Sequence, residues 1–313
     1  GNTMKNVNVS DYVLLAEASY ADFSNGLSKS QIDEALMEST EKNKNVVNYI
    51  TNNYEVVAHW KDRGNFFTSA DKDQSSGFSG TLFHKIPKNK EEKEIGAEYV
   101  LALRGTNDGK DILVTDAGDI VNDGLAHHQI VDMYNFWQQI TAPKGEPYDV
   151  MRITTFSKRD EANLVGKLTN LLLKAKIPVK TTILVDLLVS NSQVLYSEAV
   201  LSFLRDIDPD AEGLFVDSGE IKLIKRERSD NLYQFGDERR LGLGIPVSKV
   251  TTTGHSLGGH LSAAFSRLFP DKTEHSYMVN GAGFGAPLNP LGHILSNAKW
   301  NIDSLFSALN GAG

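Results

Sequence analysis

The chain has 313 residues, with 32 lysines and arginines against 40 aspartates and glutamates, so its formal net charge is −8. This acidic balance gives no general attraction to nucleic acid or to anionic membranes, and we expect no nucleic-acid partner. Cysteine is absent, which excludes disulfides, thiolate zinc sites and thiol nucleophiles, while the 40% apolar content is that of a globular chain.

The first hundred residues predict two helices and then three strands, judged from apolar residues at helical spacing and from short apolar runs. A serine provides a cap for the second helix, and a charged run (KNKEEK) between the last two strands fits a solvated turn. The third strand run (YVLAL) is typical of a buried strand in a mostly parallel sheet. In chain order we predict helices at 11–23 and 30–49 (capped by Ser28 or Ser30), strands at 54–59 and 77–86, the turn at 88–93 and the strand at 99–103.

The remaining chain continues the alternation of helices and strands. One stretch rich in Gly, Asp and charge predicts loops and a short hairpin, and it includes a run (KLIKRER) that could form a local basic patch. In chain order we predict a loop at 118–125, helices at 128–140 and 160–175, a strand at 180–189, a helix at 192–204, the loops at 208–245, a strand at 247–253, a helix at 256–268, a strand at 277–279, a flexible stretch at 281–285, and helices at 290–298 and 302–309. This alternation favours an α/β fold, a sheet with helices on its faces.

The most informative motif is G-x-S-x-G, which lies between a β-branched strand and a helix. Ser256 is its central residue, flanked by His255 and Leu257 and bracketed by Gly254 and Gly258. Such a turn holds a serine hydroxyl above a sheet, and the glycines leave room for its strained backbone. The N–H group of Leu257, at the start of the helix, can stabilise an oxyanion. Ser256 is therefore the candidate nucleophile of an acyl-transfer reaction.

Two alternatives concern these segments. Ser256 could be a structural serine in a glycine-rich turn that binds an anion. A second segment, 99–106 (YVLALRGT), ends a strand in a glycine and a hydroxyl residue, which can place donors beside the nucleophile. Its alternative is an ordinary strand end, with Arg104 paired to Asp108 or Asp111.

Four blocks of the sequence together resemble a known family. GHSLGG after a β-branched strand, LALRGT upstream, LLAEASYADF near the N-terminus and YMVNGAGFGAP downstream look like bacterial members of the class 3 (fungal-type) lipases, in the α/β-hydrolase superfamily. The resemblance implies a mixed, mainly parallel sheet flanked by helices. It implies Ser256 as nucleophile and Thr106 and Leu257 as oxyanion-hole residues, with Asp116 and Asp119 near the family's structural aspartate.

The implied activity is hydrolysis of lipid carboxylic esters through an acyl-serine intermediate, as a triacylglycerol lipase or a phospholipase A1. The partner is thus a lipid or ester substrate, with contact to a lipid interface left open, and no cofactor is implied. Bacterial relatives are commonly secreted, so an extracellular location is expected, although no signal-peptide pattern is visible. The alternatives are a peptidase or thioesterase on the same turn, and a non-catalytic hydrolase-like binding module.

Two features depart from the family pattern. Residues 143–246 are longer than the usual connection, and we interpret them as an insertion within a single lipase-like domain spanning 1–313. In the family the catalytic acid and then the histidine follow the serine, whereas the candidate pair His293 and Asp303 follows Ser256 in the reverse order. We therefore expect the acid and base to lie beyond Gly313, with the chain truncated before them.

The other histidines have ordinary structural interpretations. His255 is expected to pack within the turn and His260 to lie at the surface or packed on its helix. The rest fall in predicted strands or at a helix start, namely His59, His84, His127, His128 and His275. No metal constellation stands out, since Asp119, Asp123 and His127 fit a solvated loop better than a site. The helices after Pro290 fit a lid or core helices equally well, and the oligomeric state is not indicated.

Overall fold

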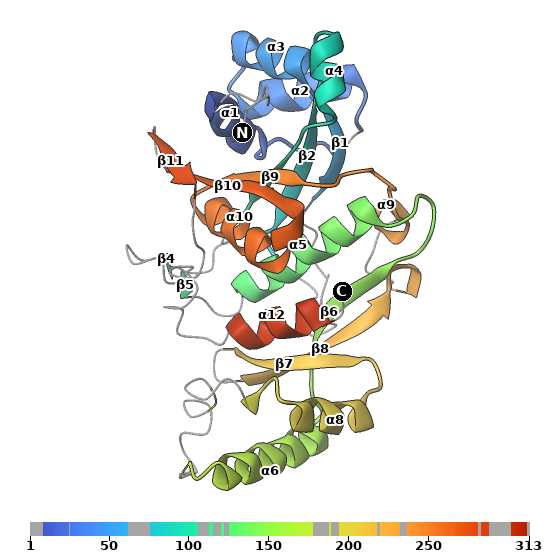
Figure 1. Ribbon diagram of the computed structural model, residues 1–313, viewed down its shortest axis with the longest axis vertical. Coiled ribbons are helices and arrows are strands. Elements are labelled where there is room, and N and C mark those ends of the chain that lie inside the picture. Colours follow the sequence, from blue (N-terminus) through green and yellow to red (C-terminus); the bar gives the residue numbers. More distant parts are fainter. Residues whose placement is uncertain are drawn as a thin grey trace.

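The described residues form two main sheets, joined and covered by helices, and a small two-stranded sheet of β4 and β5, as the computed structural model in Figure 1 shows. The structure describes residues 9–24, 26–61, 76–105, 113–114, 120–121, 125–177, 188, 194–217, 220–231, 237–280, 283–287 and 302–311. The N-terminal helices lie at one end of the long axis and the second sheet at the other, with the larger sheet between them.

The larger sheet is mixed, with six strands in the order β1-β2-β3-β9-β10-β11. β3, β9 and β10 are parallel to one another, whereas the other neighbours are antiparallel, so β1, β3, β9 and β10 all point the same way. The predicted mixed α/β architecture is confirmed at this level. The strands are β1 (Tyr54–Trp60), β2 (Ser79–Lys85), β3 (Tyr99–Arg104), β9 (Val250–His255), β10 (Thr273–Asn280) and β11 (Gly283–Pro287).

Helices cover both faces of this sheet, because the strand residues alternate between two apolar clusters. On β3, Val100 and Ala102 join the cluster under the N-terminal helices, while Leu101 and Leu103 join the cluster on the opposite face. The first face carries α1 (Val9–Ala18), α2 (Lys29–Ser39) and α3 (Lys44–Asn53), and the second carries α5 (Leu125–Thr141) and α10 (Leu257–Leu268).

Three predictions for the N-terminal third were wrong in detail. The single helix expected at 30–49 is divided into α2 and α3, because Glu41 and Lys42 take positive φ angles and Asn43 caps a new helix. The cap of α2 is Ser28. The expected turn at 88–93 contains the short helix α4 (Lys90–Ile95), capped by Asn89. The first helix ends at Ala18, five residues before its predicted end.

The smaller sheet lies within 143–246, the segment expected to be an insertion. It is antiparallel in the order β6-β8-β7, and α6 (Lys158–Lys174) and α8 (Glu198–Ile207) pack on it. A hairpin was expected within 208–245 and is present, but it is longer than predicted, since its two strands run from Ala211 to Arg228. The strands are β6 (Asp149–Thr155), which the sequence did not indicate, β7 (Ala211–Asp217) and β8 (Glu220–Arg228).

Polar side chains of α5 connect the two sheets. The amide of Asn135 is buried, donating to the carbonyl of Met151 at 2.9 Å and accepting from the N–H of Met151 at 2.8 Å. Gln139 donates to the carbonyls of Glu238 and Leu241. α12 (Ile302–Gly311) also packs here, and it adds apolar side chains to the cluster between the larger sheet and α5. These are Leu305, Phe306, Ala308 and Leu309.

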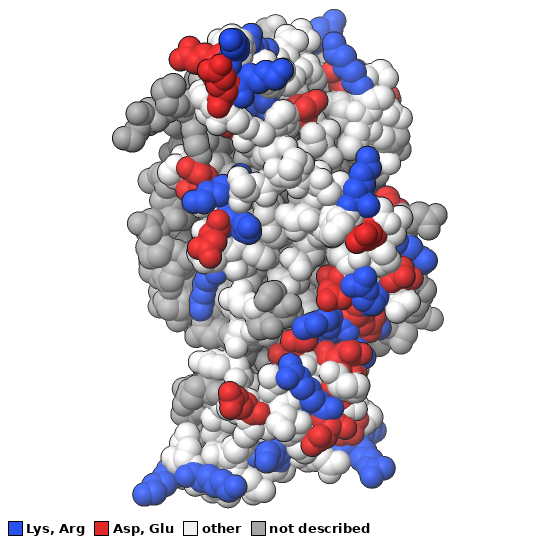
Figure 2. Space-filling view, turned by 45° about the vertical axis from the view of Figure 1, so that its right-hand side comes forward, with Lys and Arg blue, Asp and Glu red and all other residues white. Residues whose placement is uncertain are grey.

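The basic run on β8 is neutralised by neighbouring carboxylates. Lys225 lies 2.6 Å from Asp208, Arg226 lies 2.7 Å from Glu212 and Arg228 lies 2.8 Å from Asp149. Figure 2 shows the resulting mixture of basic and acidic side chains over this end of the molecule. The run therefore does not form the separate basic patch considered above. In the part of the chain that the structure describes, helices are too short or too polar to cross a bilayer.

The remaining elements are short, and some predictions fall outside the described residues. These are the strand expected at 180–189 (apart from Leu188) and the helix expected at 290–298. β11 lies where a flexible stretch was expected. The short elements are β4 (Leu113–Val114), β5 (Ile120–Val121), α9 (Asp237–Arg240) and the 3-10 turns at Ser229–Asn231 and Pro270–Lys272.

Candidate active site

Ser256 occupies a sharp turn between a central strand and a helix. β9 ends at His255, α10 begins at Leu257, and Ser256 lies between them with φ 53° and ψ −115°. This backbone conformation is strained for a residue with a side chain. It is held in place because the Ser256 N–H donates to the Val279 carbonyl at 3.1 Å and its own carbonyl accepts from Gly259 at 2.9 Å. The side chain of Ser256 is exposed, as a nucleophile requires.

The glycines around Ser256 are required by close backbone packing. A Cβ on Gly254 would lie 2.2 Å from the Gly258 carbonyl oxygen, and one on Gly258 would lie 2.2 Å from the Leu103 carbonyl oxygen. A Cβ on Gly259 would lie 2.4 Å from Met278. The G-x-S-x-G spacing thus lets the first turn of α10 approach both β9 and β3, as the motif predicts.

The end of β3 lies beside the start of α10. A Cβ on Gly105 would meet the Leu257 side chain at 2.8 Å and the Gln129 side-chain oxygen at 2.6 Å. Leu257 is the first residue of α10, so its N–H has no acceptor within the helix. The two segments expected to supply oxyanion donors are therefore adjacent, although Thr106 lies outside the described residues.

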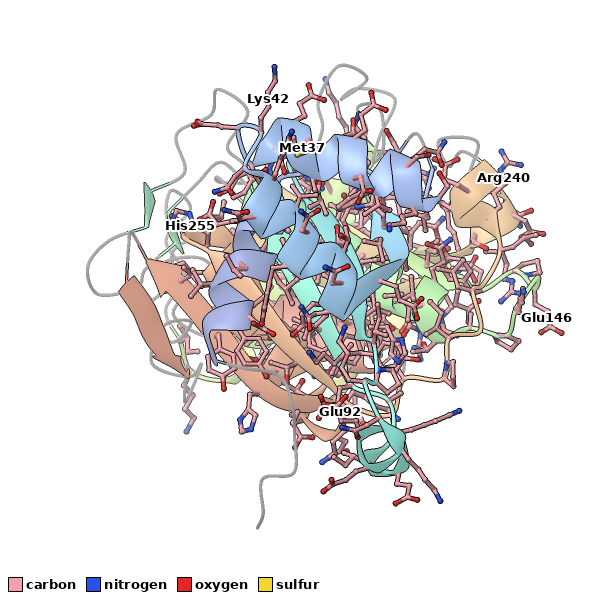
Figure 3. All side chains as sticks on the ribbon, turned by 90° about the horizontal axis from the view of Figure 1, so that it is seen from above. Met37, Lys42, Glu92, Glu146, Arg240 and His255 are labelled. Atoms are coloured by element: carbon pink, nitrogen blue, oxygen red, sulfur yellow. The ribbon has the colours of Figure 1, made fainter. Side chains whose placement is uncertain are left out.

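Three side chains from distant parts of the sequence meet at His255, the residue before Ser256. The Arg104 guanidinium stacks over the ring of Tyr20 at 4.9 Å, and the Tyr20 hydroxyl lies 3.5 Å from Nδ1 of His255. His255, labelled in Figure 3, lies at the edge of the N-terminal helices. Burial raises the pKa of Tyr20 and Arg104 opposes this, so the phenol remains protonated at neutral pH. All three residues fall within blocks that resemble the family, namely LLAEASYADF, LALRGT and GHSLGG, but their contact was not predicted, because the sequence does not show which blocks meet in the fold.

Among the described residues, no side chain forms a hydrogen bond with the Ser256 hydroxyl, and this includes the histidines. His260 is a buried residue of α10, and burial lowers its pKa to about 4. Burial also lowers the pKa of His59 to about 4 and holds the pKa of His127 well below its usual range. His84 pairs with Glu55 at 2.7 Å.

Several predicted residues cannot be placed. Asp116, Asp119, Asp123 and His293 lie outside the described residues, and of Asp303 only the backbone in α12 is described. The described residues hold no group of three or more His, Asp or Glu side chains that could bind a metal.

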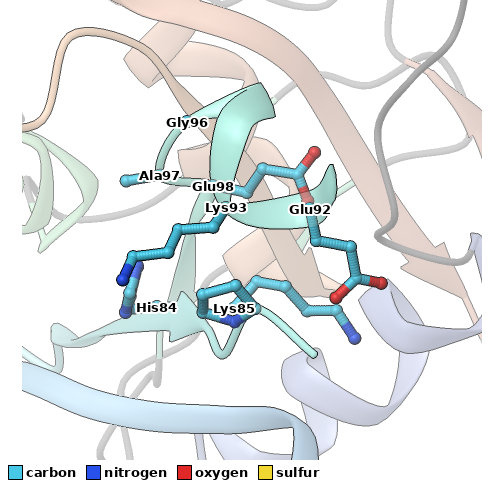
Figure 4. A pocket seen from close by; sticks show the side chains of 8 residues that line it. His84, Lys85, Glu92, Lys93, Gly96, Ala97 and Glu98 are labelled. Carbon is cyan, nitrogen blue, oxygen red and sulfur yellow. The ribbon is translucent and has the colours of Figure 1, made fainter. Parts of the chain in front are cut away.

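Two pockets lie at the opposite end of the parallel strands from Ser256. One, of about 220 Å³, is lined by residues of β2, α4 and the segment that leads into β3, including His84, Lys85 and Glu92 (Figure 4). The other, of about 200 Å³, reaches Tyr99 and Thr251 near the beginnings of β3 and β9. Neither is lined by a residue of the Ser256 turn, so we do not assign them to the candidate active site.

No protein-family model matches the chain, and comparison with curated proteins and with solved structures gives no match either.

Proposed function

We propose that the protein is a serine carboxylic-ester hydrolase of the α/β-hydrolase type, acting on lipids through an acyl-Ser256 intermediate. The observation that carries the proposal is the exposed Ser256 at positive φ between β9 and α10. A strained turn that presents a hydroxyl at a helix N-terminus is the arrangement that nucleophilic acyl transfer requires.

In the proposed reaction, Oγ of Ser256 attacks the carbonyl carbon of the ester while a base accepts the hydroxyl proton. The N–H of Leu257, together with Thr106, stabilises the oxyanion. The bond to the alcohol then breaks, the alcohol leaves with a proton, and water hydrolyses the acyl-serine. The residues that act as base and as its orienting acid remain unassigned.

The lipid substrate is supported by the family resemblance of the motifs, and not by the described pockets. The main alternatives are a peptidase or thioesterase that uses the same turn, and a hydrolase-like module that binds without catalysis. The absence of a histidine bonded to Ser256 among the described residues is the observation that favours the last of these.

A substrate panel distinguishes these functions. We expect the protein, assayed together with the segment that supplies its acid and base, to hydrolyse p-nitrophenyl esters and short-chain glycerides, with little turnover of matched peptide and thioester substrates. Ser256→Ala should abolish the ester activity. Ser266→Ala is the matched control, because Ser266 lies on the same helix and its hydroxyl bonds only the Ala263 carbonyl. A chain that turns over none of these substrates would favour the binding module.

A further inference from the structure

Arg104 and His255 are neighbours at the carboxyl end of the parallel strands. The register of β3 and β9 pairs Ala102 with Thr253 and Leu103 with Gly254. The next positions along the two strands are Arg104 and His255. Both fall on the face of the sheet that carries the N-terminal helices, where Tyr20 contacts each of them.

The guanidinium of Arg104 has no carboxylate partner among the described residues. Its Nε is buried and makes no hydrogen bond to a described residue. Tyr20 covers one face of the guanidinium, which fixes its plane and leaves its edge as the donor surface. An arginine held in this way is suited to pairing with a planar or tetrahedral anion.

Other arginine stacks in the molecule differ from this one in their position. Arg239 stacks over Trp60 at 4.1 Å, but its side chain is buried in the interior. Arg267 stacks over Phe306 at the far end of α10 from Ser256. Arg104 alone among these three lies at the carboxyl end of β3, beside the end of β9 that leads into the exposed serine, with a partly exposed phenol next to it.

We infer that Arg104, supported by Tyr20 and His255, binds a phosphate group of the substrate next to Ser256. The inference rests on the proposed function and specifies it: the substrate is an ester lipid that carries a phosphate, in preference to a neutral glyceride. The guanidinium and the Tyr20 hydroxyl donate to the phosphate oxygens, so the scissile ester is held near the nucleophile.

The test compares two substrates with the same acyl chains, dihexanoylglycerol and dihexanoyl-glycerophosphate, in the full chain and its variants. Arg104→Gln should lower kcat/KM for the phosphate-bearing substrate by about tenfold and leave kcat/KM for the neutral substrate unchanged. Arg267→Gln, the matched control, removes the arginine–ring stack at the far end of α10 and should change neither value. Arg104→Lys should recover only part of the selectivity, because the ammonium lacks the planar fork.

Inorganic phosphate identifies the source of the anion. If inorganic phosphate, added at a concentration equal to the KM for the lipid, leaves wild-type turnover of dihexanoylglycerol unaffected, the group that the site recognises is the phosphate of the lipid. If phosphate inhibits wild type but not Arg104→Gln, the site binds free phosphate. The second result by itself supports an anion site at Arg104, whereas the first supports it only together with the substrate-selective loss in Arg104→Gln.

Equal losses on the two substrates in Arg104→Gln would overturn the inference and leave Arg104 a structural residue, with the esterase function intact. Failure of the wild type to hydrolyse either substrate would instead contradict the proposed function. The two failures are therefore distinguishable.

Discussion

Gly258→Ala places a methyl group where α10 meets β3. The added Cβ would lie 2.2 Å from the Leu103 carbonyl oxygen and 3.3 Å from the Arg104 Cα atom, whereas ordinary contacts begin at 3.4 Å. Both neighbours are backbone atoms in the centre of the sheet, so they cannot move aside as a flexible side chain would. The start of α10 must separate from β3 by roughly 1 Å to relieve the clash.

The magnitude follows from two opposing effects. Alanine is favoured over glycine inside a helix by about 1 kcal/mol, but overpacking of this kind costs about 1–3 kcal/mol or more. We expect the free energy of unfolding to fall by about 2 kcal/mol. Because the Leu257 N–H moves with the helix, ester turnover should fall by about a hundredfold.

Urea unfolding and ester hydrolysis measure the two effects. Gly166→Ala is the matched control, since Gly166 lies on the exposed side of α6 with nothing within 4 Å of an added Cβ. That variant should be stabilised by about 1 kcal/mol with unchanged turnover. If Gly258→Ala were as stable and as active as Gly166→Ala, the close approach of α10 to β3 would not be what requires glycine in the motif.

Two further predictions concern stability. The pKa of His260 in the folded protein is about 4, against its ordinary value of 6.5. Between these pH values the unfolded chain therefore binds a proton on His260 that the folded chain does not. Lowering the pH from 7 to 5 should thus reduce the free energy of unfolding by about 2 kcal/mol through this residue. Urea unfolding of His260→Gln should show a correspondingly weaker fall between these pH values, and an identical fall would contradict burial of a neutral imidazole. Asn135→Ala leaves the N–H and carbonyl of Met151 without their partner, so chemical denaturation should show a loss of about 3 kcal/mol; a loss below about 1 kcal/mol would mean that water replaces the amide.

The elements around Ser256 were predictable because each has a local cause. The apolar run that forms β3 and the β-branched run that forms β9 read as buried strands, and a glycine-bracketed serine before a helical pattern marks the turn. The division between α2 and α3 was missed because apolar residues at helical spacing continue past it, on Val46, Val47 and Ile50.

The smaller sheet depends on long-range pairing that a local pattern does not reveal. Asp149 of β6 pairs with Arg228 of β8, and neither strand is apolar enough to be recognised alone. The charges of β8 made it resemble a surface loop, but the structure places carboxylates from other segments beside them, such as Asp208 and Glu212.

The same reason applies to the surroundings of the serine. Tyr20 lies 235 residues from His255 in the chain, and only the fold brings them together. The sequence offered Asp108 or Asp111 as local partners for Arg104, both of which lie outside the described residues, whereas the observed contact is with the Tyr20 ring.

Covalent modification of one hydroxyl tests the central claim most directly. After incubation of the full-length protein with a fluorophosphonate, its intact mass should rise by a single adduct, and fragmentation should locate the adduct on Ser256. The Ser256→Ala variant should remain unmodified. A wild-type chain that gains no adduct, or one whose adduct maps to another residue, would contradict the assignment of Ser256 as the nucleophile.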